Sequence, residues 1–281
     1  MLNIPSTSNI YFGMTKLDIP PKLDCDYTME KITSELKRYF QETGIKRGVI
    51  GLSGGLDSST TLALLTRAIG VENTYVYIMP SRATPKESIE YAIKMIESLD
   101  IPQDNWRKID IEPLIRCFDG VLAFQDQVIR GNTMARIRMT LLYAEAKRLN
   151  AIVVGTGDKS ELLIGYYTKY GDGGVDILPI GDIYKTQLRE LAIKLGVPRE
   201  IAYKPSSPEL WKGHKAEEEI GLTYERIDGI LYLFYDLNKK KEEILEYGFD
   251  EWEVDLVLNR YYKSIHKRTM PPIIKINDGT T

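Results

Sequence analysis

The sequence predicts an α/β protein with a parallel, twisted sheet and helices on both faces. Short apolar runs that suit buried strands alternate with longer segments of helical periodicity, which is typical of right-handed β-α-β connections. The first run leads into a glycine-rich turn and then a helix, so ligands should bind at the carboxyl edge of the sheet. We expect one domain over residues 25–272, with a lead-in over 1–24 and a tail over 273–281.

Four apolar runs are the expected strands, and helical patterns flank them. The strands are expected at 49–52, 74–79, 106–111 and 151–154. A helix over 29–40 should end at Gly44, and Pro85 should open another helix. Further helices should begin near Asp57, cover 132–149 and begin at 184–186, and the chain after 181 should be mostly helical.

The turn after the first strand is the strongest candidate for a ligand site. It reads Ser53-Gly54-Gly55-Leu56-Asp57-Ser58-Ser59. The two glycines allow a tight bend and close approach of an anion, which the free N–H groups of the following helix attract. The serine hydroxyls add further donors. The alternative is a plain glycine turn in which Ser53 or Asp57 caps the helix.

The residue at the start of that helix distinguishes two kinds of phosphate loop. Loops that transfer a γ-phosphoryl group carry a lysine there, whereas this turn has Asp57. Because a carboxylate does not bind phosphate directly, Asp57 implies a bridging Mg²⁺. The turn therefore suits a pyrophosphate group held with a metal.

Two later loops add carboxylates that could join this site. Glu161 closes the segment 155–161 after the fourth strand, and Asp172 lies in the aromatic, glycine-rich segment 165–174. Both are candidate Mg²⁺ ligands. The alternatives are a first-turn helix carboxylate for Glu161 and a turn residue for Asp172. The tyrosines of 165–174 could stack on a heterocycle.

Three basic residues are candidate partners of anions. Lys185 stands at the start of a helix, where a cation is unfavourable unless an anion binds nearby, so it is a candidate phosphate ligand. Arg138 borders the apolar face of the 132–149 helix and needs an anionic partner, with an ordinary salt bridge as the alternative. Arg82 follows the second strand and could reach a nucleotide or stay in solvent.

Composition restricts the partners and the compartment. The formal net charge is −3 over 281 residues, so nothing global steers the chain to nucleic acid or a membrane. Cys25 and Cys117 are too few for a disulfide framework, and no apolar run has the length of a membrane span. We therefore expect a cytoplasmic protein. The apolar segment 121–129 could pack against another subunit.

Several segments together resemble the ammonia-dependent NAD synthetases. The glycine turn alone is shared with the wider superfamily of N-type ATP pyrophosphatases. The more specific strings are Asn132 with Arg136-x-Arg138-Met139, Gly155-Thr156 with Lys159-Ser160-Glu161, Thr168 to Gly173, Tyr184 to Gln187, Leu210-Trp211, Glu219-x-Gly221, Tyr224 with Ile227-Asp228, and His266-Lys267-Arg268 with Pro271-Pro272. The resemblance covers about residues 28–272 and implies a Rossmann-like fold of the adenine nucleotide alpha hydrolase type.

The resemblance also implies a reaction, a homodimer and a set of site residues. ATP would activate the carboxylate of deamido-NAD as an acyl adenylate, with release of pyrophosphate, and ammonia would then displace AMP to give NAD. Asp57, Asp172 and Lys185 would be catalytic, and Asp57, Glu161 and Asp172 would bind Mg²⁺. ATP would contact Gly51, Leu52, Ser53, Gly54, Gly55, Asp57, Ser58, Ser59, Arg82, Thr156, Lys185 and Ser207. Deamido-NAD would contact Asn132, Arg136, Tyr167, Lys169, Asp176, His266 and Lys267.

The nitrogen donor and two departures from the family pattern complete the expectations. A glutamine-using enzyme needs a cysteine nucleophile with its own domain, and neither cysteine has such a setting. We therefore expect free ammonia, which a separate glutaminase could supply. Asp158 stands where the family often has Asn, and His214 stands where it often has Gln. We expect His214 to be solvated. A tRNA-modifying ligase would want a basic surface or CxxC cysteines, and a nucleotide sensor could lack the carboxylates.

Overall fold

A four-stranded parallel sheet forms the centre of the protein. The computed structural model describes residues 19–124, 126–211 and 213–276, so most of the predicted lead-in and the end of the predicted tail lie outside the described residues. The strands are β1 (Arg47–Gly51), β2 (Thr74–Ile78), β3 (Trp106–Lys108) and β4 (Ala151–Val154), in the order β3-β2-β1-β4. The predicted α/β class and the four strand positions are confirmed.

Helices cover both faces of the sheet because successive strand residues point to opposite sides. Ile50, Val76 and Val154 pack under one layer, while Val49 and Val153 pack under the other. The first layer contains α1 (Cys25–Thr43), α2 (Leu56–Ile69), α3 (Lys86–Ser98), α7 (Lys185–Lys194) and α8 (Arg199–Ala202). The second layer contains α4 (Glu112–Leu122) and α5 (Gln127–Leu149).

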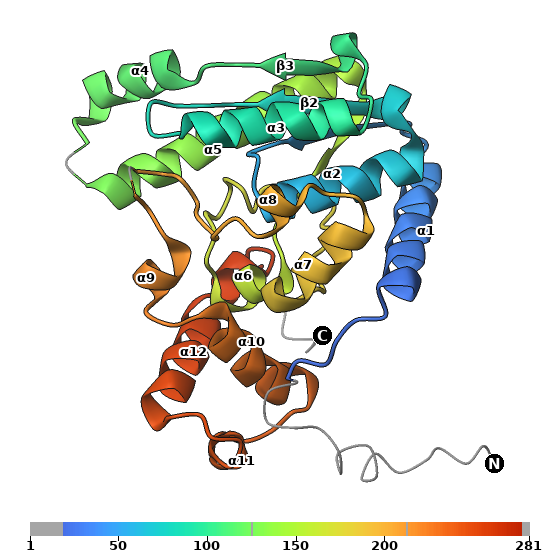
Figure 1. Ribbon diagram of the computed structural model, residues 1–281. Helices are drawn as coiled ribbons and strands as arrows, with labels where there is room; N and C mark the ends of the chain where they lie inside the picture. Colours follow the sequence, from blue (N-terminus) through green and yellow to red (C-terminus); the bar gives the residue numbers. More distant parts are fainter. Residues whose placement is uncertain (1–18, 125, 212, 277–281) are drawn as a thin grey trace.

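The later part of the chain builds a separate helical lobe, whose helices α9 to α12 are drawn in orange and red in Figure 1. Its own hydrophobic core joins α6 (Lys159–Ile164), α9 (Ala216–Ile220), α10 (Tyr224–Leu231), the π turn Tyr232–Asp236, α11 (Lys241–Leu245) and α12 (Glu251–Lys263). Short 3-10 turns lie at Val71–Asn73, Gln103–Asn105 and Ile265–Lys267. This confirms the mostly helical character predicted after residue 181. Across the described residues, no helix combines the length and apolar character that a membrane crossing requires.

The start of α2 agrees with the sequence-based expectation, whereas one boundary of α5 and one of β3 differ from it. α2 has Gly55 as N-cap without a side-chain cap, so neither Ser53 nor Asp57 caps it. α5 begins at residue 127, earlier than expected, because Asp126 accepts hydrogen bonds from the N–H groups of Val128 and Ile129. β3 ends early at residue 108, although the N–H groups of residues 109 and 111 still donate to the carbonyls of residues 78 and 80.

The strand order creates a crevice for a ligand. The chain adds β2 and β3 on one side of β1 and then returns to place β4 on the other side. The connections that follow β1 and β4 therefore leave the sheet from neighbouring carboxyl ends. Such a switch point is where open parallel sheets bind ligands.

Candidate active site

A cavity of about 460 Å³ opens at this switch point. Its walls come from the segments after β1, β2 and β4, from α5, from the loop 165–175 and from the segment 206–214. The sequence-predicted site residues that line it are Gly51, Leu52, Ser53, Asp57, Ser58, Asn132, Thr156, Glu161, Tyr167, Asp172, Ser207 and Lys267. Residues predicted from distant parts of the sequence thus meet around one space.

The glycine turn packs against α3 so closely that only glycine fits at one position. Gly54 has φ +79°, and a Cβ there would lie 2.0 Å from the backbone oxygen of Ser88. Ser53 and Ser58 hydroxyls lie 3.0 Å apart, and the Gly55 N–H donates to Ser53 Oγ at 3.3 Å. The turn is therefore held rigid from both sides, with the N-terminus of α2 directed at the cavity.

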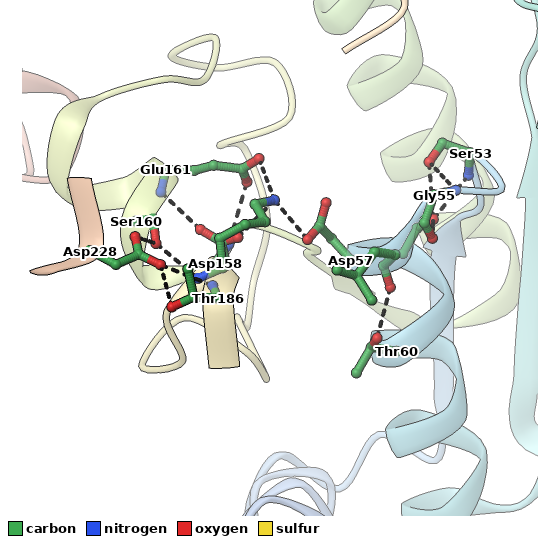
Figure 2. A network of polar contacts seen from close by, with 12 residues as sticks. Ser53, Gly55, Asp57, Thr60, Asp158, Ser160, Glu161, Thr186 and Asp228 are labelled. Atoms are coloured by element: carbon green, nitrogen blue, oxygen red, sulfur yellow. Dashed lines mark hydrogen bonds and ion pairs between the residues drawn. The ribbon is translucent and has the colours of Figure 1, made fainter. Parts of the chain in front are cut away.

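Lys185, the first residue of α7, has its ammonium group among three carboxylates. Its Nζ lies 2.7 Å from Asp57 Oδ1, 2.7 Å from Asp158 Oδ2 and 2.9 Å from Glu161 Oε1. Figure 2 shows Asp57 reaching from α2, while Asp158 and Glu161 come from the N-terminal turn of α6. We call Asp57, Asp158 and Glu161 the acidic cluster. Asp57 and Glu161 also line the cavity, whereas Lys185 is buried behind them.

Opposing electrostatic effects meet in this group. Burial by itself lowers the pKa of Lys185, but the carboxylates of Asp158, Asp57 and Glu161 outweigh it and hold the pKa well above its ordinary value. Burial raises the pKa of both Asp158 and Glu161, and the Lys185 ammonium opposes that rise. Lys185 therefore remains a cation that the acidic cluster requires.

A second group of predicted residues forms the opposite side of the site. Asn132 Oδ1 on α5 accepts a hydrogen bond from Thr168 Oγ1 at 2.6 Å. Lys169 Nζ donates to the His266 carbonyl at 2.5 Å, and Lys267 Nζ donates to the carbonyl of Tyr167 at 2.7 Å. A guanidinium N–H of Arg136 donates to the Lys169 carbonyl at 3.3 Å. The segments that begin at residues 132, 166 and 266 thus lie together in space. They contain six of the seven residues predicted to contact deamido-NAD.

Asp172 belongs to a different charge environment from the acidic cluster. Its Oδ1 accepts the Thr168 N–H at 2.8 Å. Desolvation by the surrounding protein raises the pKa of its carboxyl. The hydrogen bond from Thr168 and the charges of Lys267 and Arg138 oppose that rise. Arg138 in turn has the anionic neighbours that the sequence analysis required, since the carboxylates of Asp172 and Glu209 oppose the lowering of its pKa by burial.

The predicted three-carboxylate metal site is not assembled in this structure. Within residues 19–124, 126–211 and 213–276, no group of three or more His, Cys, Asp or Glu is arranged to hold a metal ion. Asp57 and Glu161 do face one point, which Lys185 Nζ occupies. Two carboxylates suit Mg²⁺ when substrate phosphates supply further oxygens, so this pair has the right donor chemistry.

Two further predicted residues lie apart from the cavity walls. The Arg82 side chain is mostly exposed, and its Nε lies 3.6 Å from Glu112 Oε1. Asp176 contacts β4, where its Oδ2 accepts the Val153 N–H at 2.8 Å, and its Oδ1 accepts the Tyr143 hydroxyl at 2.8 Å. Their roles toward ligands stay predictions.

The sequence patterns did not predict one polar group in the cavity wall, formed by His214, Glu219 and Tyr166. His214 is buried, not solvated as expected; its Nε2 lies 2.7 Å from Glu219 Oε2 and 3.2 Å from the Tyr166 hydroxyl. Its ring stacks on Trp211, with centroids 3.5 Å apart. The Leu-Trp and Glu-x-Gly strings marked this region, but periodicity gave no sign that these side chains meet.

Comparison with known proteins assigns the chain to a family. The family model for NAD synthase matches residues 28–271. The chain belongs to the NAD synthase family. A curated NH(3)-dependent NAD(+) synthetase of Sulfurisphaera tokodaii is 46% identical over 256 residues, which cover 91% of each chain.

Solved structures give the same answer for this NAD synthase. An NMN synthetase from Francisella tularensis superimposes with a TM-score of 0.79 at 31% identity, covering 90% of this chain and 99% of that one. An NH3-dependent NAD synthetase from Campylobacter jejuni, solved with a nitrate ion, gives 0.76 at 29% identity, covering 90% and 100%. The Rossmann-like fold and the enzyme class implied by the resemblance are confirmed.

Proposed function

We propose that this NAD synthase converts deamido-NAD to NAD with ATP and ammonia. The observation that carries the proposal is the meeting of Asp57, Glu161 and Lys185 beside a glycine turn that has no lysine of its own. A carboxylate oxygen of the nicotinate attacks the α-phosphorus, and the bond from that phosphorus to the bridging oxygen of the β-phosphate breaks. Pyrophosphate leaves from the end of the nucleotide that the glycine turn and the Lys185 ammonium group would bind.

The second half-reaction uses the acyl adenylate formed in the first. Ammonia attacks the acyl carbon, AMP leaves with the former carboxylate oxygen, and the nitrogen loses a proton. Asp172 lines the cavity with a raised pKa, so it is placed to take that proton. The deamido-NAD group described above (Asn132, Arg136, Tyr167, Lys169, His266 and Lys267) would orient the nicotinate nucleotide.

Mg²⁺ is part of the proposal, with Asp57 and Glu161 as its protein ligands. When bound with the nucleotide, the ion would neutralise charge on the phosphates. Lys185 balances the acidic cluster in the structure, and it would be free to contact phosphate oxygens once a second cation shares that charge. Asp172 does not join these two carboxylates.

We further propose that a second copy of the chain covers α4 and the start of α5. Phe118, Val121, Leu122, Val128 and Ile129 are exposed there, and Val121 has 82% of its surface accessible. Ile129 lies one helical turn before Asn132, so this apolar face borders the deamido-NAD group.

Both Cys25 and Cys117 are free thiols, which suits a reducing cytoplasm.

The test follows atoms through both steps. With ATP, Mg²⁺, ammonium and deamido-NAD, the products should be NAD, AMP and pyrophosphate, and ¹⁸O placed in the nicotinate carboxylate should appear once in AMP. ADP as product, or pyrophosphate release that does not require the acid substrate, would overturn the proposal. Nicotinate mononucleotide is assayed in parallel, because one structural neighbour is an NMN synthetase; a higher kcat/KM for it would replace the dinucleotide as substrate.

A further inference from the structure

Asp228 lies outside the cavity walls but is bonded to the two helices that carry the acidic cluster and Lys185. It sits on α10 in the helical lobe, and its exposed fraction is 0%. Its Oδ1 accepts the Ser160 hydroxyl at 2.5 Å, and its Oδ2 accepts the Thr186 N–H at 2.9 Å and the Thr186 hydroxyl at 2.8 Å. Figure 2 shows these bonds beside the acidic cluster.

The same carboxylate reaches the backbone of Lys185 through one relay. Ser160 Oγ donates to Asp228 and accepts the N–H of Lys185 at 2.9 Å. The first two N–H groups of α7 are thus satisfied by Asp228 directly or through Ser160. A negative charge at a helix N-terminus is favourable, whereas the Lys185 cation at the same end is not. Asp228 therefore offsets the cost of placing a lysine at that position.

Ser160 gives Asp228 a hold on the acidic cluster as well. It lies between Asp158 and Glu161 in the first turn of α6. One buried carboxylate therefore fixes the helix that presents Glu161 and the helix that presents Lys185, and it does so without touching the cavity.

We propose that Asp228 is a positioning residue for the phosphate end of the nucleotide site, acting through Ser160 and the first turn of α7 on Lys185. This inference rests on the proposed function only in taking Lys185 as a phosphate ligand. The helical lobe then contributes to nucleotide binding through Asp228, in addition to its contribution to stability.

The test measures affinity for α,β-methylene ATP with Mg²⁺ by calorimetry, which needs no turnover. At about pH 8, above the pKa of about 7 for Asp228, the carboxyl is mostly ionised. Asp228→Asn should then weaken binding by about 10- to 100-fold, because hydrogen bonds to a charged group are lost. In a Lys185→Met background the same substitution should change the affinity less than about 2-fold, since non-additivity marks residues that act through one another. An equal loss in both backgrounds would mean that Asp228 acts only on the fold and would overturn the proposal.

A matched control separates positioning from general stability. Glu253 is a buried carboxylate in the same lobe, and its Oε1 accepts a hydrogen bond from Arg226 Nε at 2.8 Å, but it has no bond to α6 or α7. Glu253→Gln should lower the melting temperature and leave the affinity unchanged; a comparable loss of affinity would also overturn the proposal.

A second pair of variants covers the case in which Lys185→Met does not fold. Ser160→Ala removes the relay, so Ser160→Ala combined with Asp228→Asn should weaken binding no more than the stronger single change. Strictly additive losses would refute the relay. Failure of the wild type to form NAD would reject the proposed function, yet these affinities would still decide the role of Asp228.

Discussion

Lys185 Nζ lies 2.7 Å from Asp57 Oδ1, although 128 residues separate them in the sequence. The pair joins the first turn of α7 to the first turn of α2 across the base of the cavity. The glycine turn has no lysine of its own, but Lys185 from α7 lies beside it. The carboxylates of the acidic cluster hold that lysine in place. This contact explains why the acidic cluster can stay together in a partly buried site.

Removing that ammonium should unfold the protein more easily. Lys185→Met leaves three neighbouring carboxylates without their counter-charge, so we expect the free energy of unfolding in urea to fall by about 3–5 kcal/mol. Added Mg²⁺ should restore part of the loss. The control is Lys194→Met at the other end of α7, whose exposed ion pair with Asp26 is worth about 0–1 kcal/mol. Equal losses for the two variants would contradict the buried-charge argument.

The carboxylate of Asp57 should matter for turnover and not for folding. Asp57→Asn keeps the size of the side chain and leaves two carboxylates beside Lys185. We expect pyrophosphate release in the presence of deamido-NAD to fall by roughly 100-fold or more, with an unchanged melting temperature. Asp26→Asn, an exposed change on α1, serves as the control. Near-normal turnover would remove Asp57 from the proposed Mg²⁺ site.

Two glycines with similar backbone angles allow a sharp test of the turn. Gly54 and Gly44 have φ of +79° and +68°, but a Cβ meets the Ser88 oxygen at Gly54 and nothing within 4 Å at Gly44. Gly44→Ala should cost about 1 kcal/mol of unfolding free energy from the backbone angle alone. Gly54→Ala should cost more than about 2 kcal/mol and also weaken ATP binding. Similar losses would show that the contact with α3 is not tight.

The pH dependence of stability should report on Asp228. Burial raises its pKa to about 7, against hydrogen bonds from Ser160 and Thr186, and the nearby Asp158 carboxylate adds to the rise. The Asp228 carboxyl therefore binds a proton more tightly in the folded protein than in the unfolded chain. Its stabilising contribution is full below the unfolded pKa and is lost as pH rises through about 7.

The measurement compares unfolding free energies of wild type and Asp228→Asn at several pH values. Between about pH 5 and 8 the wild type should lose stability relative to the variant. Glu253→Gln provides the opposite sign, because the hydrogen bond from Arg226 lowers the pKa of Glu253, and its contribution is lost only as pH falls. A constant difference between wild type and Asp228→Asn across that range would show that Asp228 does not titrate there.

The apolar face on α4 and α5 should control the oligomeric state. Val121→Asp places a charge in the proposed interface, so sedimentation should show a shift from dimer to monomer. Trp252→Asp changes another exposed apolar site, on α12, and should leave the dimer intact. A wild-type monomer at micromolar concentration would reject the proposed pairing.

Sequence patterns predicted the parts of this enzyme that depend on neighbouring residues. The glycine turn and the strand ending at Gly51 are local signals, and the structure has them where they were expected. The Lys185 contacts, the burial of His214 and the bonds of Asp228 depend on side chains brought together from distant segments. Local periodicity carries no information on such meetings, so Asp228 was seen only as part of a family string. The early start of α5 was missed because Asp126 caps it outside the apolar pattern.

The bonds of Asp228 also set an order for events during synthesis. The sheet and the glycine turn leave the ribosome first, and domains fold as their residues emerge. The first turn of α7 cannot gain its complete set of contacts until residue 228 has been translated, because Thr186 donates to Asp228. We therefore expect the start of α7, with Lys185, to be complete only after about four-fifths of the polypeptide has been made, so that a nucleotide held by Lys185 should bind late in synthesis.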